Sequence, residues 1–272
     1  MGYVKILVIP VAGAGTRLRP ATYATPKELL RLVDKPIAWY LLAEVYQAGI
    51  RRVIFVTHKD NPLTREFFES RRADSLLVDF PGLDVSFIET DMRGGDGQAI
   101  VLAKDMVGQD PFAVSMGDMI TLPGTSILAE LVEVYNTTGQ PVISVEQVPR
   151  EKTPQYGVID PGGHSSNVYR VRGIVEKPLP EDAPSNLAMT GKYILEPSIF
   201  SYLEKLQGGE GELKLAYALN AYASERVLNA CIPNTKHYDT GTKAELFKTE
   251  VAFSLAHPEL GGTARAILQE IK

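Results

Sequence analysis

Residues 5–36 read KILVIPVAGAGTRLRPATYATPKELLRLVDKP, and this stretch decides how the rest of the chain is interpreted. It begins with an apolar, β-branched run over residues 6–11, long enough for one buried strand. Gly13 and Gly15 follow directly. Glycines at such a place let the backbone come close to a ligand, so that successive N–H groups can line an anion. The stretch therefore predicts a phosphate-binding loop after a buried strand.

Two prolines and two basic residues characterise the segment after these glycines. Pro20 and Pro26 argue against one long helix starting at Gly15 and favour an irregular loop draped across the site. Arg17 and Lys27 would add fixed positive charge beside the glycines. We therefore expect a loop that grips phosphate.

Two better-known glycine motifs are excluded by single positions. A dinucleotide-binding turn requires a third glycine where Leu18 stands, followed at once by a helix. A P-loop requires Gly-Lys-Ser/Thr at its end, and this chain has none there. A glycine pair after a strand is common in α/β proteins. The full run, Gly-x-Gly-Thr-Arg-x-x-Pro followed by Pro-Lys-Glu and Lys-Pro, is far more specific.

The first half of the chain alternates short apolar runs with amphipathic segments. Strands are expected at residues 6–11, 52–57, 85–89 and 112–116. Helices are expected at 37–47, 61–69 and 98–106, with Asn61 as N-cap of the second and Pro62 at its first position. This alternation is typical of the α/β class, with a Rossmann-like, mostly parallel central sheet and helices on both faces. Ligands of such sheets gather at the carboxyl ends of the strands.

The second half is richer in strand patterns. Strands are expected at residues 142–148, 156–160, 168–175 and 188–195, with a turn at Pro161-Gly162-Gly163. Helices are expected at 197–206, 213–223, 243–256 and 263–271. Because the chain has no long linker, we expect one domain over residues 1–272, with only a notional boundary between residues 1–140 and 141–272.

Composition excludes several classes of protein. No apolar run reaches the roughly 18 residues of a membrane helix, and the N-terminus lacks a signal-peptide pattern, so a cytoplasmic protein is expected. A net charge of −5 gives no electrostatic reason to expect nucleic acid as a partner. Cys231 is the only cysteine, which excludes an intramolecular disulfide and a cysteine-rich zinc site. We expect it to be a small core residue.

Carboxylates and a lysine mark three further places. Asp118 follows a buried strand, and Asp239 stands in Tyr-Asp-Thr-Gly. Carboxylates brought together from distant segments suit a hard divalent cation, whereas a lone Gly-Asp is more often a turn. Glu176 and Lys177 end a strand before Pro178, and strand alternation would turn them to opposite faces unless the backbone bends there. A solvated Glu-Lys pair is the alternative.

Taken together, these motifs resemble the signature of the sugar-1-phosphate nucleotidylyltransferases, which join a nucleoside triphosphate to a sugar phosphate and release pyrophosphate. The runs VDKP at 33–36, VEKP at 175–178 and EDAPSNLA at 181–188 are most similar to the bacterial uridylyltransferase branch, which uses UTP and glucose 1-phosphate. The run HPELG at 257–261 fits the same branch. The resemblance extends from residue 6 to residue 261.

The resemblance implies a GT-A-like nucleotidyltransferase fold, in which residues 1–140 bind the nucleotide and residues 141–272 form a smaller β-rich sugar-binding part with C-terminal helices. It implies that Mg²⁺ is held by Asp118 and Asp239, and that this fold assembles into dimers or tetramers. The implied catalytic residues are Arg17, Lys27, Asp118 and Lys177. The implied nucleotide-binding residues are Ala12, Gly13, Gly15, Thr16, Arg17, Thr90 and Gly95. The implied sugar-phosphate residues are Gly157, Glu176, Lys177, Asn186 and Gly191.

Several positions depart from the uridylyltransferase pattern and keep alternatives open. A glutamine that could pair with the uracil edge is replaced by Thr90, and Gln98 is typical of the thymidylyltransferase branch. Asp96 could accept N–H bonds from a different base. Residues 214–217 read KLAY where the family has Gln-Leu-Thr-Asp. The alternatives are a thymidylyl- or other nucleotidylyltransferase acting on another sugar 1-phosphate, or a non-catalytic homologue that binds a nucleotide sugar.

Overall fold

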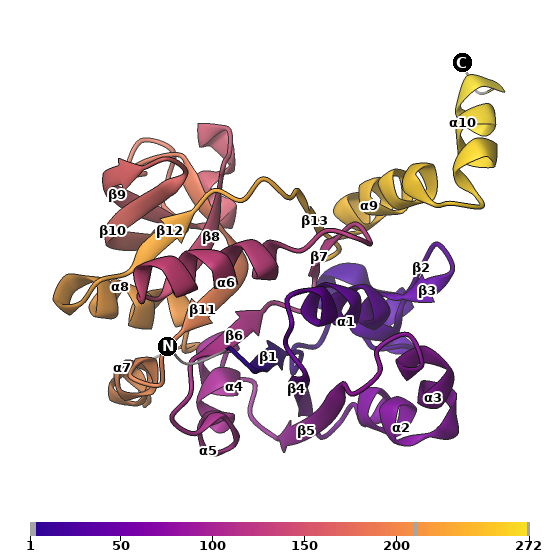
Figure 1. Cartoon of the computed structure of the whole chain (residues 1–272), viewed down its shortest axis with the longest axis horizontal. Coiled ribbons are helices and arrows are strands. Elements are labelled where there is room, and N and C mark those ends of the chain that lie inside the picture. The colour runs from indigo at the N-terminus through magenta and orange to yellow at the C-terminus, as the bar shows by residue number, and fades with distance from the viewer. Residues whose placement is uncertain (1–3, 209–210, 271–272) are drawn as a thin grey trace.

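One mixed nine-stranded sheet forms the centre of the molecule, a computed structural model that describes residues 4–208 and 211–270 (Figure 1). Its strand order is β5-β4-β1-β6-β11-β8-β12-β10-β9. The strands are β1 (Ile6–Pro10), β4 (Arg52–His58), β5 (Asp84–Thr90), β6 (Phe112–Ser115), β8 (Val142–Gln147), β9 (Gly157–Ser165), β10 (Val168–Glu176), β11 (Leu187–Leu195) and β12 (Asn229–Cys231). Two small ribbons pair β7 (Met119–Thr121) with β13 (His237–Asp239), and β2 (Arg31–Leu32) with β3 (Lys35–Pro36).

The first four sheet positions are the parallel part that the alternating sequence predicts. β1 pairs in parallel with β4 on one side and β6 on the other, and β5 extends the sheet beyond β4. Of these, β1, β4 and β6 are nearly continuous apolar runs because both of their faces are covered by helices. Their carboxyl ends therefore lie at one edge of the sheet.

The second half continues the same sheet, mainly with antiparallel strands. β11 joins the two halves, because it pairs with β6 on one side and with β8 on the other. The expected turn at Pro161-Gly162-Gly163 is wrong: β9 runs through these residues, and the chain reverses after Ser165. The register of β9 against β10 shifts near Pro161, and β9 is the last strand of the sheet there. A proline is tolerated at such an irregular edge because its missing N–H is not needed.

The helices divide between the two faces of the sheet. α1 (Ile37–Gln47) and α6 (Ile127–Thr138) pack on one face, and α4 (Asp96–Leu102), α7 (Ile199–Leu206) and α8 (Leu215–Glu225) pack on the other. The remaining helices are α2 (Leu63–Glu69), α3 (Arg71–Leu77), α5 (Lys104–Val107), α9 (Lys243–Ala256) and α10 (Gly261–Glu270).

Helix boundaries differ from the sequence prediction at several points. α2 begins one residue late, with Pro62 rather than Asn61 at its N-cap and no capping side chain. The expected helix over residues 98–106 is two short helices that meet at Ala103. α3 and α6 were not predicted, although Ser126 caps α6 by accepting the Ala129 N–H. Of the last expected helix, residue 271 lies outside the described residues.

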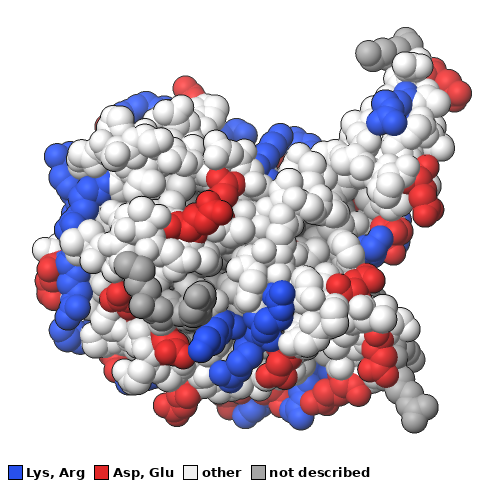
Figure 2. All heavy atoms as spheres, in the orientation of Figure 1, with Lys and Arg blue, Asp and Glu red and all other residues white. Residues whose placement is uncertain are grey.

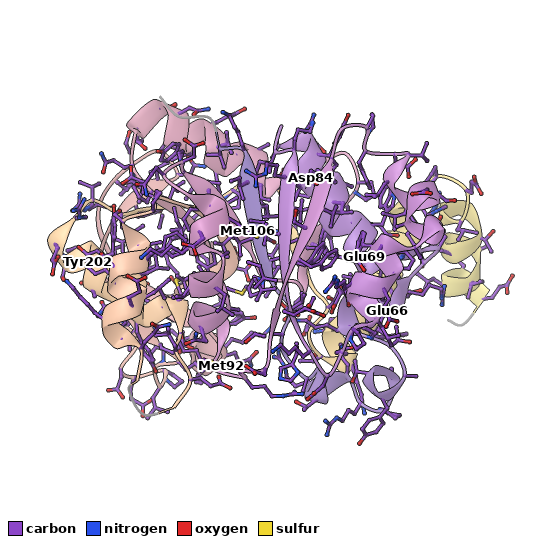
Figure 3. All side chains as sticks on the ribbon, turned by 90° about the horizontal axis from the view of Figure 1, so that it is seen from below. Glu66, Glu69, Asp84, Met92, Met106 and Tyr202 are labelled. Atoms are coloured by element: carbon purple, nitrogen blue, oxygen red, sulfur yellow. The ribbon has the colours of Figure 1, made fainter. Side chains whose placement is uncertain are left out.

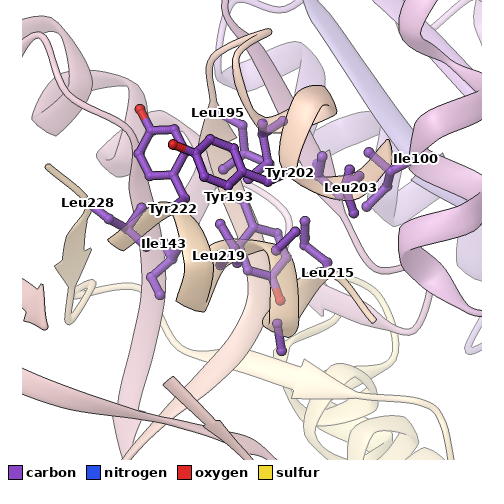
Figure 4. Close-up of a cluster of buried hydrophobic side chains, with 14 of the residues drawn as sticks. Ile100, Ile143, Tyr193, Leu195, Tyr202, Leu203, Leu215, Leu219, Tyr222 and Leu228 are labelled. Atoms are coloured by element: carbon purple, nitrogen blue, oxygen red, sulfur yellow. The ribbon is translucent and has the colours of Figure 1, made fainter. Parts of the chain in front are cut away.

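Alternation along β1 shows how the core is built. Ile6 and Val8 face the cluster that contains α4, α7 and α8, whereas Leu7 and Ile9 face the cluster that contains α1 and α6. Figure 4 shows the first cluster, where side chains of β11, α7 and α8 interlock around Tyr193. The two apolar layers hold the strand ends, and hence the loops that follow them, in fixed positions.

Cys231, the only cysteine of the chain, is a core residue, as expected. It ends β12 and is 1% exposed, and burial raises the pKa of its thiol to about 11. Since the thiolate is the reactive form, the native thiol is expected to react with iodoacetamide at pH 7.5 at least about 100-fold more slowly than a free cysteine. Mass spectrometry of native and urea-unfolded protein checks this, and equal rates would contradict it.

The C-terminal helices form an arm at one side of the molecule. α10 contacts α9 and points away from the sheet, and the space-filling view shows the arm standing clear of the body (Figures 1 and 2). On the face drawn in Figure 2, basic and acidic side chains are interspersed without a broad basic band. Among the described residues, no helix combines the length and the apolar character that crossing a bilayer requires.

Candidate active site

A cleft of about 1110 Å³ opens at the carboxyl ends of the parallel strands, between the two halves of the sheet. Segments that follow β1, β5, β6 and β10 line it, together with β13 and the first turns of α9. In Figure 3, Met92, one of the lining residues, lies low in the view, between the side of α2, where Glu66 and Glu69 lie, and the side of α7, where Tyr202 lies. This is the place where α/β sheets bind ligands.

The loop after β1 is irregular, as the prolines predict. It forms three short 3-10 turns, Thr16–Leu18, Ala21–Tyr23 and Lys27–Leu29. Gly15 has φ +60, and its carbonyl accepts the Thr22 hydroxyl at 2.8 Å, which closes the loop on itself. A Cβ at Gly15 would meet Thr22 at 3.0 Å, so glycine is required there. Of the predicted nucleotide-binding residues, Ala12, Gly13, Thr16, Arg17 and Gly95 line the cleft.

Asp118 and two basic residues of this loop meet in the cleft. Lys27 Nζ lies 3.2 Å from Asp118 Oδ2, and the Arg17 guanidinium lies 3.7 Å from the same oxygen. Burial raises the pKa of Asp118, but the Lys27 ammonium and the Arg17 guanidinium outweigh it, so the pKa lies below its ordinary value. Asp118 is therefore ionised at neutral pH, and the motif residues 17, 27 and 118 form one charged group.

Asp239 joins this group through a ribbon that sequence reasoning missed. β13 pairs with β7, which places Asp239 directly opposite Met119, the residue after Asp118. The Thr240 N–H and hydroxyl both donate to the Asp118 carbonyl, at 2.8 and 3.0 Å. These bonds fix the two aspartate segments against each other. Two strands of three residues each carry no periodicity that a sequence pattern could have revealed.

The space around Gly241 shows how closely the two carboxylates approach each other. A Cβ built on Gly241 would lie 2.9 Å from Asp118 Oδ2, 3.0 Å from Asp239 Oδ1 and 3.2 Å from the Arg17 guanidinium. The Gly241 N–H also donates to Asp239 Oδ1 at 2.5 Å. Burial raises the pKa of Asp239, the Gly241 N–H opposes this shift, and the Asp118 carboxylate adds to it. Two carboxylates and a guanidinium therefore converge around one glycine.

Glu176 and Lys177 both line the cleft, because the backbone bends between the end of β10 and Pro178. Lys177 has φ 53, a left-handed conformation that is uncommon for a residue with a Cβ, and its N–H donates to the Tyr156 carbonyl at 2.9 Å. Strand alternation alone would turn these two side chains to opposite faces, and the bend before Pro178 is what brings both to the cleft. Burial raises the pKa of Glu176, Lys177 lowers it, and Asp96 raises it further.

Two predicted glycines pack closely against residues that line the cleft. Gly157 pairs with Glu176, and a Cβ there would stand 3.1 Å from the Glu176 carboxylate and 2.4 Å from the Met189 methyl. Gly191 has φ +77 and accepts the Met116 N–H at 2.9 Å, and a Cβ there would meet Met116 at 3.0 Å. Both positions let a strand approach a residue close to the site.

Two other predicted residues do not line the cleft. Thr90 ends β5 and is 6% exposed, and its hydroxyl accepts the Met92 N–H at 3.0 Å instead of lining the cleft. Asn186 precedes β11, and its carbonyl accepts the Val148 N–H at 3.0 Å. Its side chain does not line the cleft either. The structure therefore does not bring these two side chains together with the charged group.

Asp96 lines the cleft but binds backbone groups. Its Oδ1 accepts the N–H of Gly97 at 2.7 Å and the N–H of Leu215 at 2.9 Å, so it joins the first turn of α4 to the first turn of α8. Burial raises its pKa, and the Leu215 N–H opposes the shift. Satisfying two helix starts accounts for an aspartate at this place without any base contact.

Several cleft residues have no motif that would have revealed them. Lys214 lines the cleft from the residue before α8 and pairs with Glu212 at 2.5 Å. At the opposite end, Lys236 and Lys248 face the cleft from the segment before β13 and from α9. Only the departure of Lys214 from the family pattern was visible in the sequence. The others are single lysines that sequence alone cannot distinguish from surface residues.

Gly95, between β5 and α4, gives a test of how tightly the cleft wall is packed. It has φ +92, and a Cβ there would stand 2.5 Å from the Leu213 carbonyl oxygen. Gly95→Ala is expected to lower the free energy of unfolding by at least about 2 kcal/mol, from backbone strain and disturbed hydrogen bonds. Gly124 has φ +84 with open space around it, so Gly124→Ala reports the strain alone. Urea unfolding of both variants measures the difference, and equal losses would contradict the packing argument.

A continuous sheet with a glycine-rich loop and convergent carboxylates, arginine and lysines at its carboxyl edge defines an enzyme class that binds phosphorylated substrates. The family model described as nucleotidyl transferase matches residues 6–254, and the chain belongs to this family. Relatives named UTP–glucose-1-phosphate uridylyltransferase are 36% identical in Staphylococcus epidermidis (100% of this chain, 99% of the relative) and 35% identical in Bacillus subtilis (98% and 95%).

Solved structures agree with these relatives. A UDP-glucose pyrophosphorylase complexed with UDP-glucose superposes with a TM-score of 0.87 at 30% identity, covering 93% of this chain and 100% of that one. The UTP-bound UGPase from Acinetobacter baumannii superposes with a TM-score of 0.88 at 30% identity, covering 99% and 100%. The resemblance to the uridylyltransferase branch and the predicted nucleotidyltransferase fold are thus confirmed.

Proposed function

We propose that the protein is a UTP:glucose-1-phosphate uridylyltransferase, which forms UDP-glucose and pyrophosphate from UTP and glucose 1-phosphate. The observation that carries this proposal is the convergence of Asp118, Asp239 and Arg17 on Gly241, with Lys27 bound to Asp118 in the same cleft. Full-length similarity to the uridylyltransferases named above supports the choice of UTP and glucose 1-phosphate.

The residues act in an in-line displacement at the α-phosphorus of UTP. The attacking phosphate oxygen of glucose 1-phosphate is already anionic, so no general base is required. The enzyme has to place two mutually repelling anions in contact and to stabilise the charge that spreads over the transferring group and the leaving pyrophosphate. Arg17 holds the leaving phosphates, Lys27 the phosphates near the reacting centre, and Lys177 the attacking phosphate.

The donor set fits a magnesium ion held by Asp118 and Asp239. Mg²⁺ prefers oxygen ligands and keeps several waters, so two carboxylates suffice where phosphates supply the rest. Within the described residues, no third His, Cys, Asp or Glu joins them in a metal-binding group. The raised pKa of Asp239 reflects in part the repulsion from Asp118, which a divalent cation would relieve. When bound, the ion supplies neutralisation and alignment of the phosphates.

The substrate-binding roles extend over both halves of the cleft. We assign the nucleotide to Ala12, Gly13, Gly15, Thr16 and Gly95, and the sugar to Glu176, with Gly157 and Gly191 as supports. The side chains of Thr90 and Asn186 do not line the cleft, so we assign them no direct contact with substrate. We also propose one domain that works as a unit, because the strands of both halves form one sheet.

Pyrophosphate release tests the nucleotide choice. Wild-type protein with Mg²⁺ and glucose 1-phosphate is given UTP, TTP, CTP, ATP or GTP in turn. We expect UTP to exceed each of the others at least about 10-fold in kcat/KM. Preference for TTP would leave the proposed mechanism unchanged but would class the protein as a thymidylyltransferase. Activity with none, and with no other sugar 1-phosphate, would favour a homologue that only binds nucleotide sugar.

We further propose a homo-oligomer in the cytoplasm. The projecting arm carries partly exposed apolar side chains, among them Phe247, Leu260, Ile267 and Leu268, which a second copy could cover. Light scattering of the purified protein tests for a dimer or tetramer, and a monomeric mass would contradict it.

The cytoplasmic location is proposed from the substrates. They are highly charged phosphates that do not cross membranes unaided, which favours the compartment where they are made.

A further inference from the structure

A buried ion pair lies outside the cleft, next to the loop that carries Asp118. Lys192 of β11 and Glu44 of α1 bring Nζ and Oε2 within 2.8 Å, and their side chains are 0% and 1% exposed. Neither residue lines the cleft. Charged groups are rarely buried so completely, because losing their hydration is costly, so the pair calls for a specific explanation.

Besides this ion pair, the ammonium of Lys192 donates two hydrogen bonds to the segment around Asp118. One goes to the Ser115 hydroxyl at 3.0 Å, and the other goes to the Met119 carbonyl at 2.9 Å. Ser115 ends β6 and Met119 begins β7, so a single side chain binds both ends of the three-residue loop between them.

The neighbouring residue of β11 binds the same loop through its backbone. The Gly191 carbonyl accepts the Met116 N–H at 2.9 Å, and the left-handed Gly191 lets the strand approach Met116 closely. Two consecutive residues of β11 therefore hold the loop on which Asp118 stands. Met119 is also the partner of Asp239 in the β7–β13 ribbon, so the Lys192 bond to Met119 bears on both carboxylates.

Glu44 connects the ion pair to the start of α6. Its Oε1 accepts the N–H groups of Ile127 and Leu128 at 3.1 and 3.2 Å, which are at the start of α6. The Ser126 hydroxyl donates to the Glu44 carbonyl at 3.0 Å. The pair thus connects α1 and α6 to β11, and Figure 1 shows β7 beside α1, which it contacts.

Stability alone is a poor reason for this arrangement. Replacing a buried ion pair by apolar side chains of similar volume is often neutral or stabilising. Apolar side chains could fill the space between α1 and β11, but they could not donate to the Met119 carbonyl or to Ser115. What the ion pair supplies, and apolar side chains could not, is an ammonium that donates hydrogen bonds to both ends of the loop.

We propose that Lys192 is a positioning residue, with Glu44 as its counter-ion, that fixes the loop between β6 and β7 and thereby the spacing of Asp118 and Asp239. This inference rests on the proposed function, because the consequence of that spacing is metal binding and phosphate transfer. Lys192 touches neither substrate; it acts through the backbone of Met119.

The double variant Lys192→Met/Glu44→Gln tests the proposal. It removes both charges and the donors to Met119, while the new amide side chain on α1 still offers an oxygen to the start of α6. We expect the variant to fold with a Tm within about 5 °C of wild type. Its kcat is expected to fall about 10- to 100-fold while KM for UTP changes less than about 3-fold, because the substrate-binding residues are untouched. Its affinity for Mn²⁺, measured by calorimetry without substrates, is expected to fall at least about 5-fold.

Two single variants separate positioning from stability. Glu44→Gln leaves the Lys192 amine free to donate to Met119, but it removes the counter-ion, so Tm is expected to fall while kcat stays within about 3-fold. Ser126→Ala removes the cap of α6 and is expected to lower Tm with kcat unchanged. If the double variant does not fold, Ser115→Ala removes one anchor of the ammonium and keeps the pair. It is expected to lower kcat and Mn²⁺ affinity about 3-fold or more.

A folded double variant with wild-type kcat and Mn²⁺ affinity would overturn the proposal. So would losses of activity that follow Tm across all four variants, since that pattern indicates a purely structural role. If the wild-type protein transferred no nucleotide at all, the proposed function would fail instead. The Mn²⁺ affinities of the variants would still decide whether Lys192 positions the carboxylates.

Discussion

Asp118→Asn is expected to lower kcat by about 10³-fold or more with little change in fold. The substitution keeps the shape of the side chain but removes the charge that balances Lys27 at 3.2 Å and Arg17 at 3.7 Å. It also removes one of the two carboxylates proposed to hold Mg²⁺, so both phosphate alignment and charge neutralisation are lost. Steady-state pyrophosphate release and circular dichroism together measure the effect.

A matched control distinguishes this loss from a general effect of removing a carboxylate. Asp84 begins β5, at the amino end of the strands and away from the cleft, as Figure 3 shows, and its side chain is 63% exposed. Asp84→Asn is expected to keep wild-type turnover. Near-normal turnover in Asp118→Asn would contradict the central role given to this residue.

Lys177→Ala is expected to lower kcat/KM for glucose 1-phosphate by about 10²- to 10³-fold. Lys177 lines the cleft beside Glu176, and its ammonium is proposed to hold the attacking phosphate. Without that charge, the repulsion between the two anions is offset only by the groups on the nucleotide side. The KM for UTP is expected to change much less, because Arg17 and Lys27 remain. Initial rates at varied concentrations of each substrate separate the two effects.

The left-handed backbone of Lys177 requires its own control. Its φ of 53 is strained for any residue with a Cβ, so Lys177→Gly relieves that strain while removing the same charge. Both variants are expected to be equally inactive. Lys104→Met, which removes an exposed lysine of α5 on the outer surface, is expected to leave turnover unchanged. Recovery of activity in Lys177→Gly would show that backbone geometry, and not charge, is what the position supplies.

The sequence predicts the parts of this site that are locally encoded. The loop after β1 carries its own signature, because Gly15 needs a left-handed backbone and the prolines interrupt any helix. Asp118 follows a buried strand, and the run Glu176-Lys177-Pro178 marks the end of β10. Each of these inferences depends on residues within a few positions of one another.

The parts that depend on contacts between distant segments could not be predicted in this way. The β7–β13 ribbon, which brings Asp239 to Asp118, pairs strands too short to show alternation. The buried Lys192 stands in a strand that is otherwise apolar, and only the position of Glu44 on another element explains it. The error at Pro161 has the same origin, since a proline and two glycines indicate a turn unless the strand they interrupt lies at an edge.

Thr90 shows a different limit. The family resemblance assigns Thr90, at the end of β5, to the nucleotide because a glutamine usually stands there, but its hydroxyl accepts the Met92 N–H. The Thr90 hydroxyl is therefore engaged within the loop after β5 and does not line the cleft.

Exchange of labelled pyrophosphate tests the proposed direct transfer most simply. Wild-type protein is incubated with Mg²⁺ and ³²P-pyrophosphate, together with either UDP-glucose or UTP alone. A direct attack between the two substrates predicts that label enters UTP only when UDP-glucose is present, and that removing the metal with a chelator stops it. Label entering UTP in the absence of UDP-glucose would indicate a covalent uridylyl-enzyme, and no exchange under either condition would contradict the proposed reaction itself.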